Sequence, residues 1–272
     1  MKTILVATDF SSSASNAAEY AAKMALAINA GILLLHVYQI PVSYSEIPIP
    51  LDIDDMRKEA EKYISELKAN LQSKTNGKIK IDTEVRMGVF FPHELKVVCE
   101  YINPYAVVMG SQGKTVAERL LFGSNTIFAM KYLTCPLITI PLITKYSSIK
   151  KIGLACEFDS VVDSLIVDEV KLFVNDFNAE LHVINTSEPG ITTRENSLEI
   201  KVMKQKMASL KPWYHFIKGQ DTDESIMSFT EKNKIDILIV LPKHHDILDK
   251  LIHKSHSKQM ILNSEIPVIA IH

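Results

Sequence analysis

The chain has 272 residues and a mass of 30.6 kDa, a length typical of two domains of ordinary size. Apolar residues make up 47% of it and charged residues 23%, which excludes a disordered or low-complexity chain. The 30 basic and 32 acidic side chains leave a net charge of −2, so bulk charge does not indicate a nucleic-acid-binding surface.

The cysteines and the apolar segments indicate the cellular compartment of the protein. Cys99, Cys135 and Cys156 have spacings that match neither a zinc site nor a disulfide framework, which is typical of a reducing compartment. The apolar stretch before Asp9 is too short for a signal peptide, and no apolar run is long enough to span a membrane. The sequence therefore predicts a soluble, cytoplasmic protein with neither a membrane nor a nucleic acid as partner.

The first half of the chain alternates apolar strands with helices. The expected strands are Thr3–Ala7, Ile32–Val37, Ile79–Arg86, Tyr105–Met109 and Pro136–Ile140. The expected helices are Ala14–Asn29, Asp54–Ser73, Pro92–Tyr101 and Ser124–Leu133. This alternation predicts an α/β fold, a doubly wound, five-stranded parallel sheet with helices on both faces.

The same order of elements then repeats. The segment Ile4–Phe10 (ILVATDF) resembles Ile152–Phe158 (IGLACEF), and Leu35–Val37 resembles Leu181–Val183, since both read LHV. The offset between the halves is 148 residues at the first of these matches, 146 at the second and 131 near the end of each half. Most of the length difference is therefore expected after the second strand, where the first half carries a proline-containing insert, Gln39–Leu51.

We interpret this pattern as a tandem duplication. Residues 1–146 are expected to form one doubly wound domain and residues 147–272 a second, with the boundary between Lys145 and Ser148. Each domain is long enough to bury a core of its own.

A candidate ligand site lies at the expected carboxyl edge of the first sheet. Ligands of such sheets bind beyond the carboxyl ends of the strands, where the strand order reverses, and the first and fourth strands are the expected neighbours there. Asp9 follows the first strand, and Gly110 ends the fourth. A spacing of Gly, two residues, Gly, nine residues, Gly and Ser then runs through Gly113 and Gly123 to Ser124.

The chemistry of these residues favours a nucleotide. Glycines at such a turn permit close approach of the main chain to a ligand, and the N–H groups of the helix that follows Ser124 attract an anion. Asp9 accepts hydrogen bonds only, which suits a ribose hydroxyl or an adenine amino group. Gly113-Lys114-Thr115 resembles the end of a Walker A loop, but Val108 stands where that loop needs its first glycine, and no G-x-G-x-x-G is present.

The sequence resembles a tandem universal stress protein, through TDFS at Thr8–Ser11 and the intact G-2x-G-9x-G-[ST] motif. The resemblance implies a cytoplasmic stress-response regulator that binds ATP or AMP, with or without Mg²⁺, and acts on an unidentified protein partner. It also implies domains that pair through their last strands, with each other or in a homodimer. The residues it places around the nucleotide are Ala7, Thr8, Asp9, Val37, Met109, Gly110, Gln112, Gly113, Gly123, Ser124, Asn125 and Thr126.

The second half departs from this motif. Leu241, His244 and Lys254 stand where the first half has its three glycines, and Pro242 replaces Ser111. Glu157 replaces Asp9. We therefore predict that the second domain does not bind ATP in this manner and serves as a structural partner of the first.

Histidines suggest two further hypotheses. Near the degenerate loop lies a cluster of four histidines, His244, His245, His253 and His256. They can be solvated surface residues, ligands of a metal ion or, together with Lys243 and Lys254, part of an anion site. His36 and His182 are the middle residues of the two LHV segments, and we interpret their recurrence as a sign of a role in packing.

Three functions remain open at this stage. The first is a nucleotide-binding regulator in which occupancy biases the insert Gln39–Leu51 or a surface that partners recognise. The second is an enzyme, a slow ATPase or nucleotidyl-transfer protein, although Ser11-Ser12-Ser13 lacks the glycine of a pyrophosphate loop and no general base accompanies the site. The third is a structural interaction module without a nucleotide.

Overall fold

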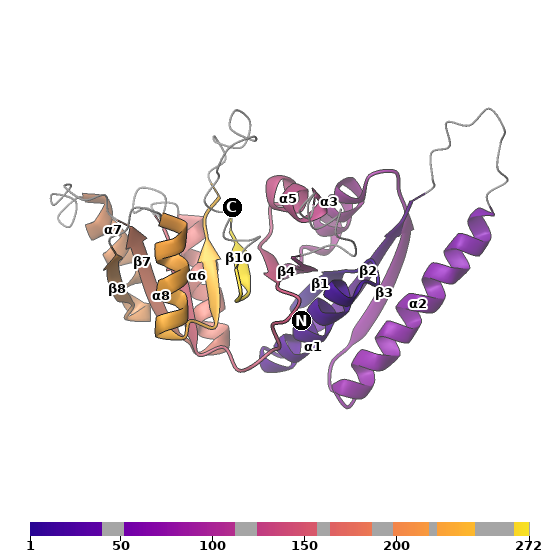
Figure 1. Cartoon of the computed structure of the whole chain (residues 1–272), viewed down its shortest axis with the longest axis horizontal. Coiled ribbons are helices and arrows are strands. Elements are labelled where there is room, and N and C mark those ends of the chain that lie inside the picture. Colours follow the sequence, from indigo (N-terminus) through magenta and orange to yellow (C-terminus); the bar gives the residue numbers. More distant parts are fainter. Residues whose placement is uncertain are drawn as a thin grey trace. The chain divides into compact units, whose positions relative to one another are not determined.

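The computed structural model describes residues 1–39, 52–111, 124–156, 164–186, 198–217, 222–242 and 264–271 (Figure 1). The chain forms two compact units, Met1–Tyr146 (unit 1) and Ser147–His272 (unit 2). Three predicted features lie outside the described residues: the insert beyond Gln39, the loop with Gln112, Gly113 and Gly123, and the cluster of His244, His245, His253 and His256 with Lys243 and Lys254.

Unit 1 contains a parallel sheet with the strand order β3-β2-β1-β4-β5. The strands are β1 (Thr3–Ala7), β2 (Gly31–Tyr38), β3 (Ile81–Met87), β4 (Ala106–Gly110) and β5 (Leu137–Ile140). The helices are α1 (Ser12–Ala27), α2 (Ile53–Lys74), α3 (Phe91–Ile102) and α5 (Ser124–Tyr132). Helix α1 packs against α2 and helix α3 against α5, and the two pairs cover opposite faces of the sheet (Figure 1). The predicted α/β class is confirmed.

Helix α1 owes its place on the sheet to small side chains. Ala17, Ala18 and Ala21 are fully buried and let the helix lie close to β1, β4 and β5. The helix begins two residues before the predicted Ala14, because the Ser11 side chain caps it and its Oγ accepts a hydrogen bond of 3.1 Å from the Ala14 N–H.

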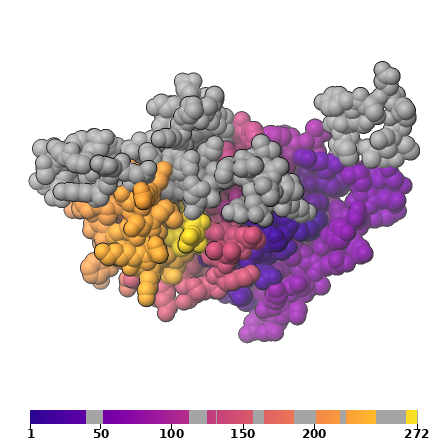
Figure 2. All heavy atoms as spheres, viewed as in Figure 1, coloured from indigo at the N-terminus to yellow at the C-terminus, as the bar shows by residue number. Residues whose placement is uncertain are grey.

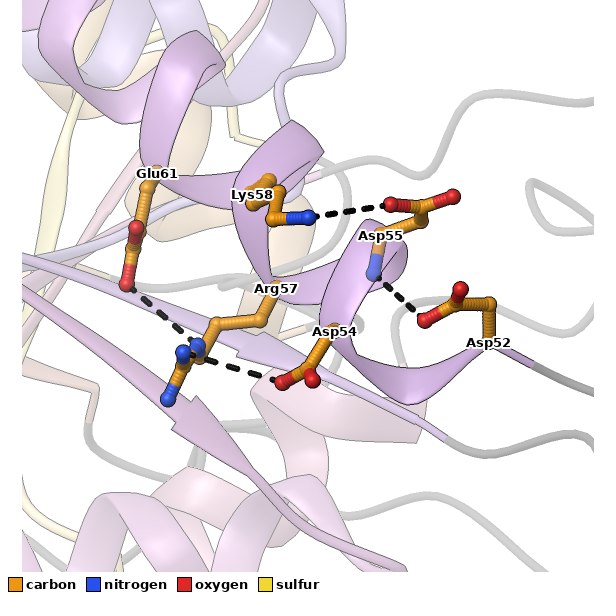
Figure 3. A network of polar contacts seen from close by, with 6 residues as sticks. All are labelled: Asp52, Asp54, Asp55, Arg57, Lys58 and Glu61. Atoms are coloured by element: carbon orange, nitrogen blue, oxygen red, sulfur yellow. Dashed lines mark hydrogen bonds and ion pairs between the residues drawn. The ribbon is translucent and has the colours of Figure 1, made fainter.

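Helix α2 is mostly solvated. Among its 22 residues only Ala60, Ile64 and Leu71 are buried, and Figure 2 shows its outer side open to solvent along unit 1. A cap and a network of exposed ion pairs stabilise its first turns (Figure 3), formed by Asp52, Asp54, Asp55, Arg57, Lys58 and Glu61. Within the described ranges neither α2 nor any other helix combines the length and apolar character of a membrane span.

Unit 2 repeats this topology, with the parallel strand order β10-β9-β6-β7-β8. Its strands are β6 (Lys151–Ala155), β7 (Glu180–Thr186), β8 (Trp213–Ile217), β9 (Ile237–Val240) and β10 (Val268–Ala270). Its helices are α6 (Ser164–Phe177), α7 (Leu198–Met207) and α8 (Thr222–Asn233), and α6 packs against α7.

The strand registers correct the internal alignment of the two units. Ile4 pairs with Ile32 in unit 1, whereas its counterpart Ile152 pairs with Leu181 in unit 2. The offset at the second strand is therefore 149 residues, and the match of the two LHV segments, with an offset of 146, is wrong. The sequence match failed because a three-residue segment such as LHV can recur by chance in buried strands. The hydrogen-bonding register of the strands allows a single alignment of the two units.

The third strands are offset by 131 residues, since Leu33 pairs with Asp82 in unit 1 and its counterpart His182 pairs with Trp213 in unit 2. The length difference between the units thus lies between the second and third strands, as predicted.

The Glu169 side chain on α6 is a source of pH-dependent stability in unit 2. Burial raises the pKa of this carboxyl from 4.5 to about 7. Because the raised pKa lies above that of the unfolded chain, the folded state loses stability as pH rises from about 4.5 to about 7. We expect Glu169→Gln to raise the melting temperature at pH 8 by a few degrees and to change it little at pH 4.5. Thermal unfolding of the full chain measures this.

The matched control is Asp168→Asn, an exposed carboxylate on the same helix. It should not reproduce the pH-dependent gain. An equal rise in melting temperature in both variants, or a rise that does not depend on pH, would contradict the view that burial of the ionised Glu169 carboxylate destabilises the fold.

A histidine pair lies between β7 and β8 of unit 2. His182 Nδ1 and His215 Nε2 are 3.0 Å apart, and the rings are nearly parallel with centroids 5.2 Å apart. The centroid distance exceeds the N···N distance by about one ring width, so the rings lie edge to edge and share an N–H···N hydrogen bond. Burial lowers the pKa of both imidazoles. At His182 the Glu180 carboxylate opposes this effect and Lys151 adds to it, and the net shift of its pKa is downward.

We expect both imidazoles to titrate below pH 6.5, so that the stability they provide is lost as pH falls from 6.5 through their lower folded-state pKa values. An NMR titration of the imidazole resonances in the full chain checks this. Titration of His182 and His215 at or above pH 6.5 would contradict it.

Candidate functional site

The carboxyl ends of β1 and β4 lie side by side in unit 1. The two strands pair in parallel with Ile4 opposite Ala106 and Val6 opposite Val108. The residues that follow them, Asp9 and Ser111, therefore leave the same edge of the sheet. Sequence reasoning predicted this neighbourhood, and the pairing confirms it.

The turn after β1 presents an acidic side chain to solvent. Thr8 is buried, and its main-chain N–H donates to the carbonyl of Leu35 at 2.9 Å. Asp9 is exposed, and its Oδ1 accepts a hydrogen bond of 2.9 Å from the Ser11 N–H. The other carboxylate oxygen, Oδ2, forms no hydrogen bond with the described part of the chain. Asp9 can therefore accept a hydrogen bond from a ligand without giving up its own.

Gly110 is required at the end of β4 by the first turn of α1. A Cβ on Gly110 would lie 2.9 Å from the main-chain carbon of Ser13 and 3.0 Å from its carbonyl oxygen, and would overlap the Ser13 Oγ. Sequence reasoning assigned this glycine to the approach of a phosphate. The structure gives it a further role, which is to admit helix α1.

Ser13 itself adds a polar group to this edge. Its side chain is 3% exposed, and its Oγ has no hydrogen-bond partner within the described ranges. A buried hydroxyl that lacks a partner costs free energy, and this one is enclosed against Gly110 at the packing of α1 on β4. No spacing rule in the sequence marked Ser13.

The start of α5 contributes Asn125 and Thr126. Asn125 is exposed, whereas Thr126 is buried and its Oγ1 donates a hydrogen bond of 3.4 Å to the carbonyl of Gly110. The Thr126 hydroxyl therefore holds α5 to the end of β4. The helix begins at the predicted Ser124, and its first N–H groups have no partner within the helix.

Three other predicted residues stand within strands. The side chains of Ala7 and Met109 are buried in the core, so only their main chain can reach the edge. Val37, on β2, is half-buried, and its Cγ1 lies 3.1 Å from the place of a Cβ on Gly88. Gln112, Gly113 and Gly123 lie outside the described residues, so the structure brings together the β1 turn, the β4 end and the α5 start only.

The equivalent edge of unit 2 is built differently. The registers place Leu241 at the position of Gly110 and Pro242 at that of Ser111. The Ser111 N–H donates to the carbonyl of Ile140 at 3.0 Å, a hydrogen bond that proline cannot form.

His36 and Asn185 are the true counterparts at the end of the second strand. His36 Nδ1 lies 2.7 Å from the carbonyl oxygen of Thr8, and Asn185 Nδ2 donates to the carbonyl of Cys156 at 3.0 Å. The predicted equivalence of His36 with His182 is wrong, because the register shifts the second strand of unit 2 by three residues.

Within the described ranges, no group of three or more His, Cys, Asp or Glu side chains is placed to hold a metal ion.

The fold of unit 1 defines a doubly wound α/β protein in which the carboxyl ends of β1 and β4 share one edge. Residues 1–141 match the family model described as the universal stress protein family. This match covers more than half of the 272 residues. The chain belongs to the universal stress protein family.

Two solved structures show the same fold over nearly the whole chain. A universal stress protein from Archaeoglobus fulgidus DSM 4304 is 20% identical, with a TM-score of 0.76 over 99% of this chain and 97% of that one. A putative universal stress protein from Pseudomonas aeruginosa UCBPP-PA14 is 12% identical, with a TM-score of 0.65 over 100% and 93%. A universal stress protein in complex with cAMP is 21% identical, with a TM-score of 0.39 over 51% and 96%. No curated protein matches the chain.

We expect Gly110→Ala to destabilise the chain by about 1–3 kcal/mol, because the added methyl group meets main-chain atoms of Ser13 that cannot turn aside. Chemical denaturation of the full chain measures the loss. The control is Gly153→Ala, whose added Cβ meets only side-chain atoms of Leu238, Ile235 and Ile184 at 3.0–3.3 Å. A loss for Gly110→Ala no larger than for Gly153→Ala would show that α1 does not require the glycine.

Proposed function

We propose that unit 1 binds one adenine nucleotide, ATP or AMP, and that the chain is a cytoplasmic stress-response regulator. Family membership supports this, because members of the universal stress protein family can bind nucleotides. The observation that carries the proposal is the Asp9 carboxylate, exposed at the β1–β4 junction with Oδ2 available to a ligand.

Asp9 is suited to the ribose or the base. An ionised carboxylate accepts hydrogen bonds and repels phosphate, so Asp9 Oδ2 takes a ribose hydroxyl or the adenine amino group. The main chain around Val37, on the neighbouring strand β2, is the proposed second contact to the base.

The phosphates are assigned to the start of α5. The N–H groups at a helix N-terminus and the helix dipole stabilise an anion, and α5 starts at Ser124. Gly113, Gly123, Ser124 and Asn125 are proposed to surround the phosphates, joined by Gln112. Thr126 is proposed to act through its main chain, because its hydroxyl bonds Gly110.

Unit 2 is proposed to be a second universal stress protein domain that does not bind nucleotide. The Leu241 side chain stands where the first unit has Gly110, and Pro242 removes an N–H. Its proposed role is to pair with unit 1 through the last strands, or to support pairing with a second chain. Light scattering of the purified protein distinguishes a monomer from a homodimer.

We expect mass spectrometry of the purified chain to find close to one adenine nucleotide per chain, and calorimetry to show one site for ATP or AMP after its removal. Asp9→Asn should weaken binding tenfold or more, because a hydrogen bond to a charged group is worth about 1.5–3 kcal/mol. Asp82→Asn, which removes an exposed carboxylate on β3, is the control and should leave the affinity unchanged.

Three results would contradict the proposal. Absence of binding by the wild-type chain would favour a structural interaction module. Two equivalents per chain would assign a site to unit 2. Steady ATP turnover well above background, lost in Asp9→Asn, would instead favour the enzyme alternative.

A further inference from the structure

The turn that carries Asp9 has a backbone conformation that needs support. Phe10 follows Asp9 and has φ +61°, in the left-handed region that a bulky side chain rarely adopts. Two hydrogen bonds stabilise the turn from within: the Phe10 N–H donates to Thr8 Oγ1 at 3.0 Å, and the Ser11 N–H donates to Asp9 Oδ1 at 2.9 Å. Strain of this kind persists only where surrounding contacts hold it.

His36 supplies such contacts from the neighbouring strand β2. Its Nδ1 lies 2.7 Å from the carbonyl oxygen of Thr8. A carbonyl oxygen only accepts, so Nδ1 carries the proton and donates. The same imidazole packs on the Phe10 ring, with centroids 4.3 Å apart. One side chain therefore holds the residue before Asp9 and the residue after it.

Unit 2 contains the same hydrogen bond with a different donor. Asn185 occupies the position of His36 and donates from Nδ2 to the carbonyl of Cys156, the counterpart of Thr8, at 3.0 Å. Thr8 and Cys156 also form the same main-chain hydrogen bond, since their N–H groups donate to the carbonyl oxygens of Leu35 and Ile184. An asparagine at this position thus forms the hydrogen bond as well as a histidine does.

We propose that His36 is a positioning residue for the nucleotide site, which fixes the Thr8 carbonyl and thereby the direction in which Asp9 presents its carboxylate. This rests on the proposed function of unit 1. The role belongs to the hydrogen bond, so a donor of another shape at position 36 can fill it, whereas an apolar side chain cannot.

The experiment compares His36→Asn with His36→Leu in the full chain, with ATP as the probe in calorimetry. We expect His36→Leu to weaken ATP binding about tenfold, the effect of about one hydrogen bond on an affinity. His36→Asn should stay within about threefold of the wild-type affinity. A purely structural role would lower the melting temperature of both variants without this difference in ATP affinity.

Asn185→Leu is the matched control, because it removes the equivalent hydrogen bond from unit 2. It should leave the ATP affinity unchanged. Amide hydrogen exchange at Phe10 and Ser11 gives a second readout for any variant that is too unstable for calorimetry. Exchange should quicken in His36→Leu and return towards the wild-type rate in His36→Asn.

The outcomes separate this proposal from the one on which it rests. If the wild-type chain binds no adenine nucleotide, the proposed function fails and the role of His36 with it. If the wild type binds and His36→Leu binds equally well, the site stands and the positioning role is overturned. If His36→Asn and His36→Leu weaken binding equally, the hydrogen bond is not the cause and the proposal is also overturned.

Discussion

The parallel pairing of β1 with β4 is the constraint on which the rest of unit 1 depends. It joins Val6 to Val108, residues far apart in the chain, and it sets the first turn of α1 against the end of β4. That close approach leaves no room for a side chain at Gly110. Because the crossover between β3 and β4 reverses the strand order here, the β1 turn and the β4 end open on one edge.

Three of the described hydroxyl groups at this edge stabilise the protein itself. Ser11 caps α1, Thr8 Oγ1 accepts from the turn, and Thr126 joins α5 to β4. Among the described residues, the groups that we propose for a ligand are the Asp9 carboxylate and the main chain at the start of α5. A ligand that carries both donors and an anion would match these groups, which supports the proposal of a nucleotide.

The two units show one scaffold with two different edges. Both keep the strand order, the main-chain hydrogen bond that follows the first strand, and a side-chain donor at the end of the second strand. They differ where a ligand would approach, since Leu241 and Pro242 replace Gly110 and Ser111. The contacts that build the sheet are thus retained in unit 2, while the small residues at its edge are not.

The sequence alone determined the elements and their order, because buried strands and amphipathic or Ala-rich helices leave local patterns. It therefore predicted the α/β class, the repeat and the neighbourhood of Asp9 and Gly110. Only the tertiary structure decided the register of β7, the packing of Ser13 on Gly110 and the hydrogen bonds of His36 and Asn185. These features depend on contacts between residues far apart in the chain, and a short motif such as LHV contains no information about such contacts.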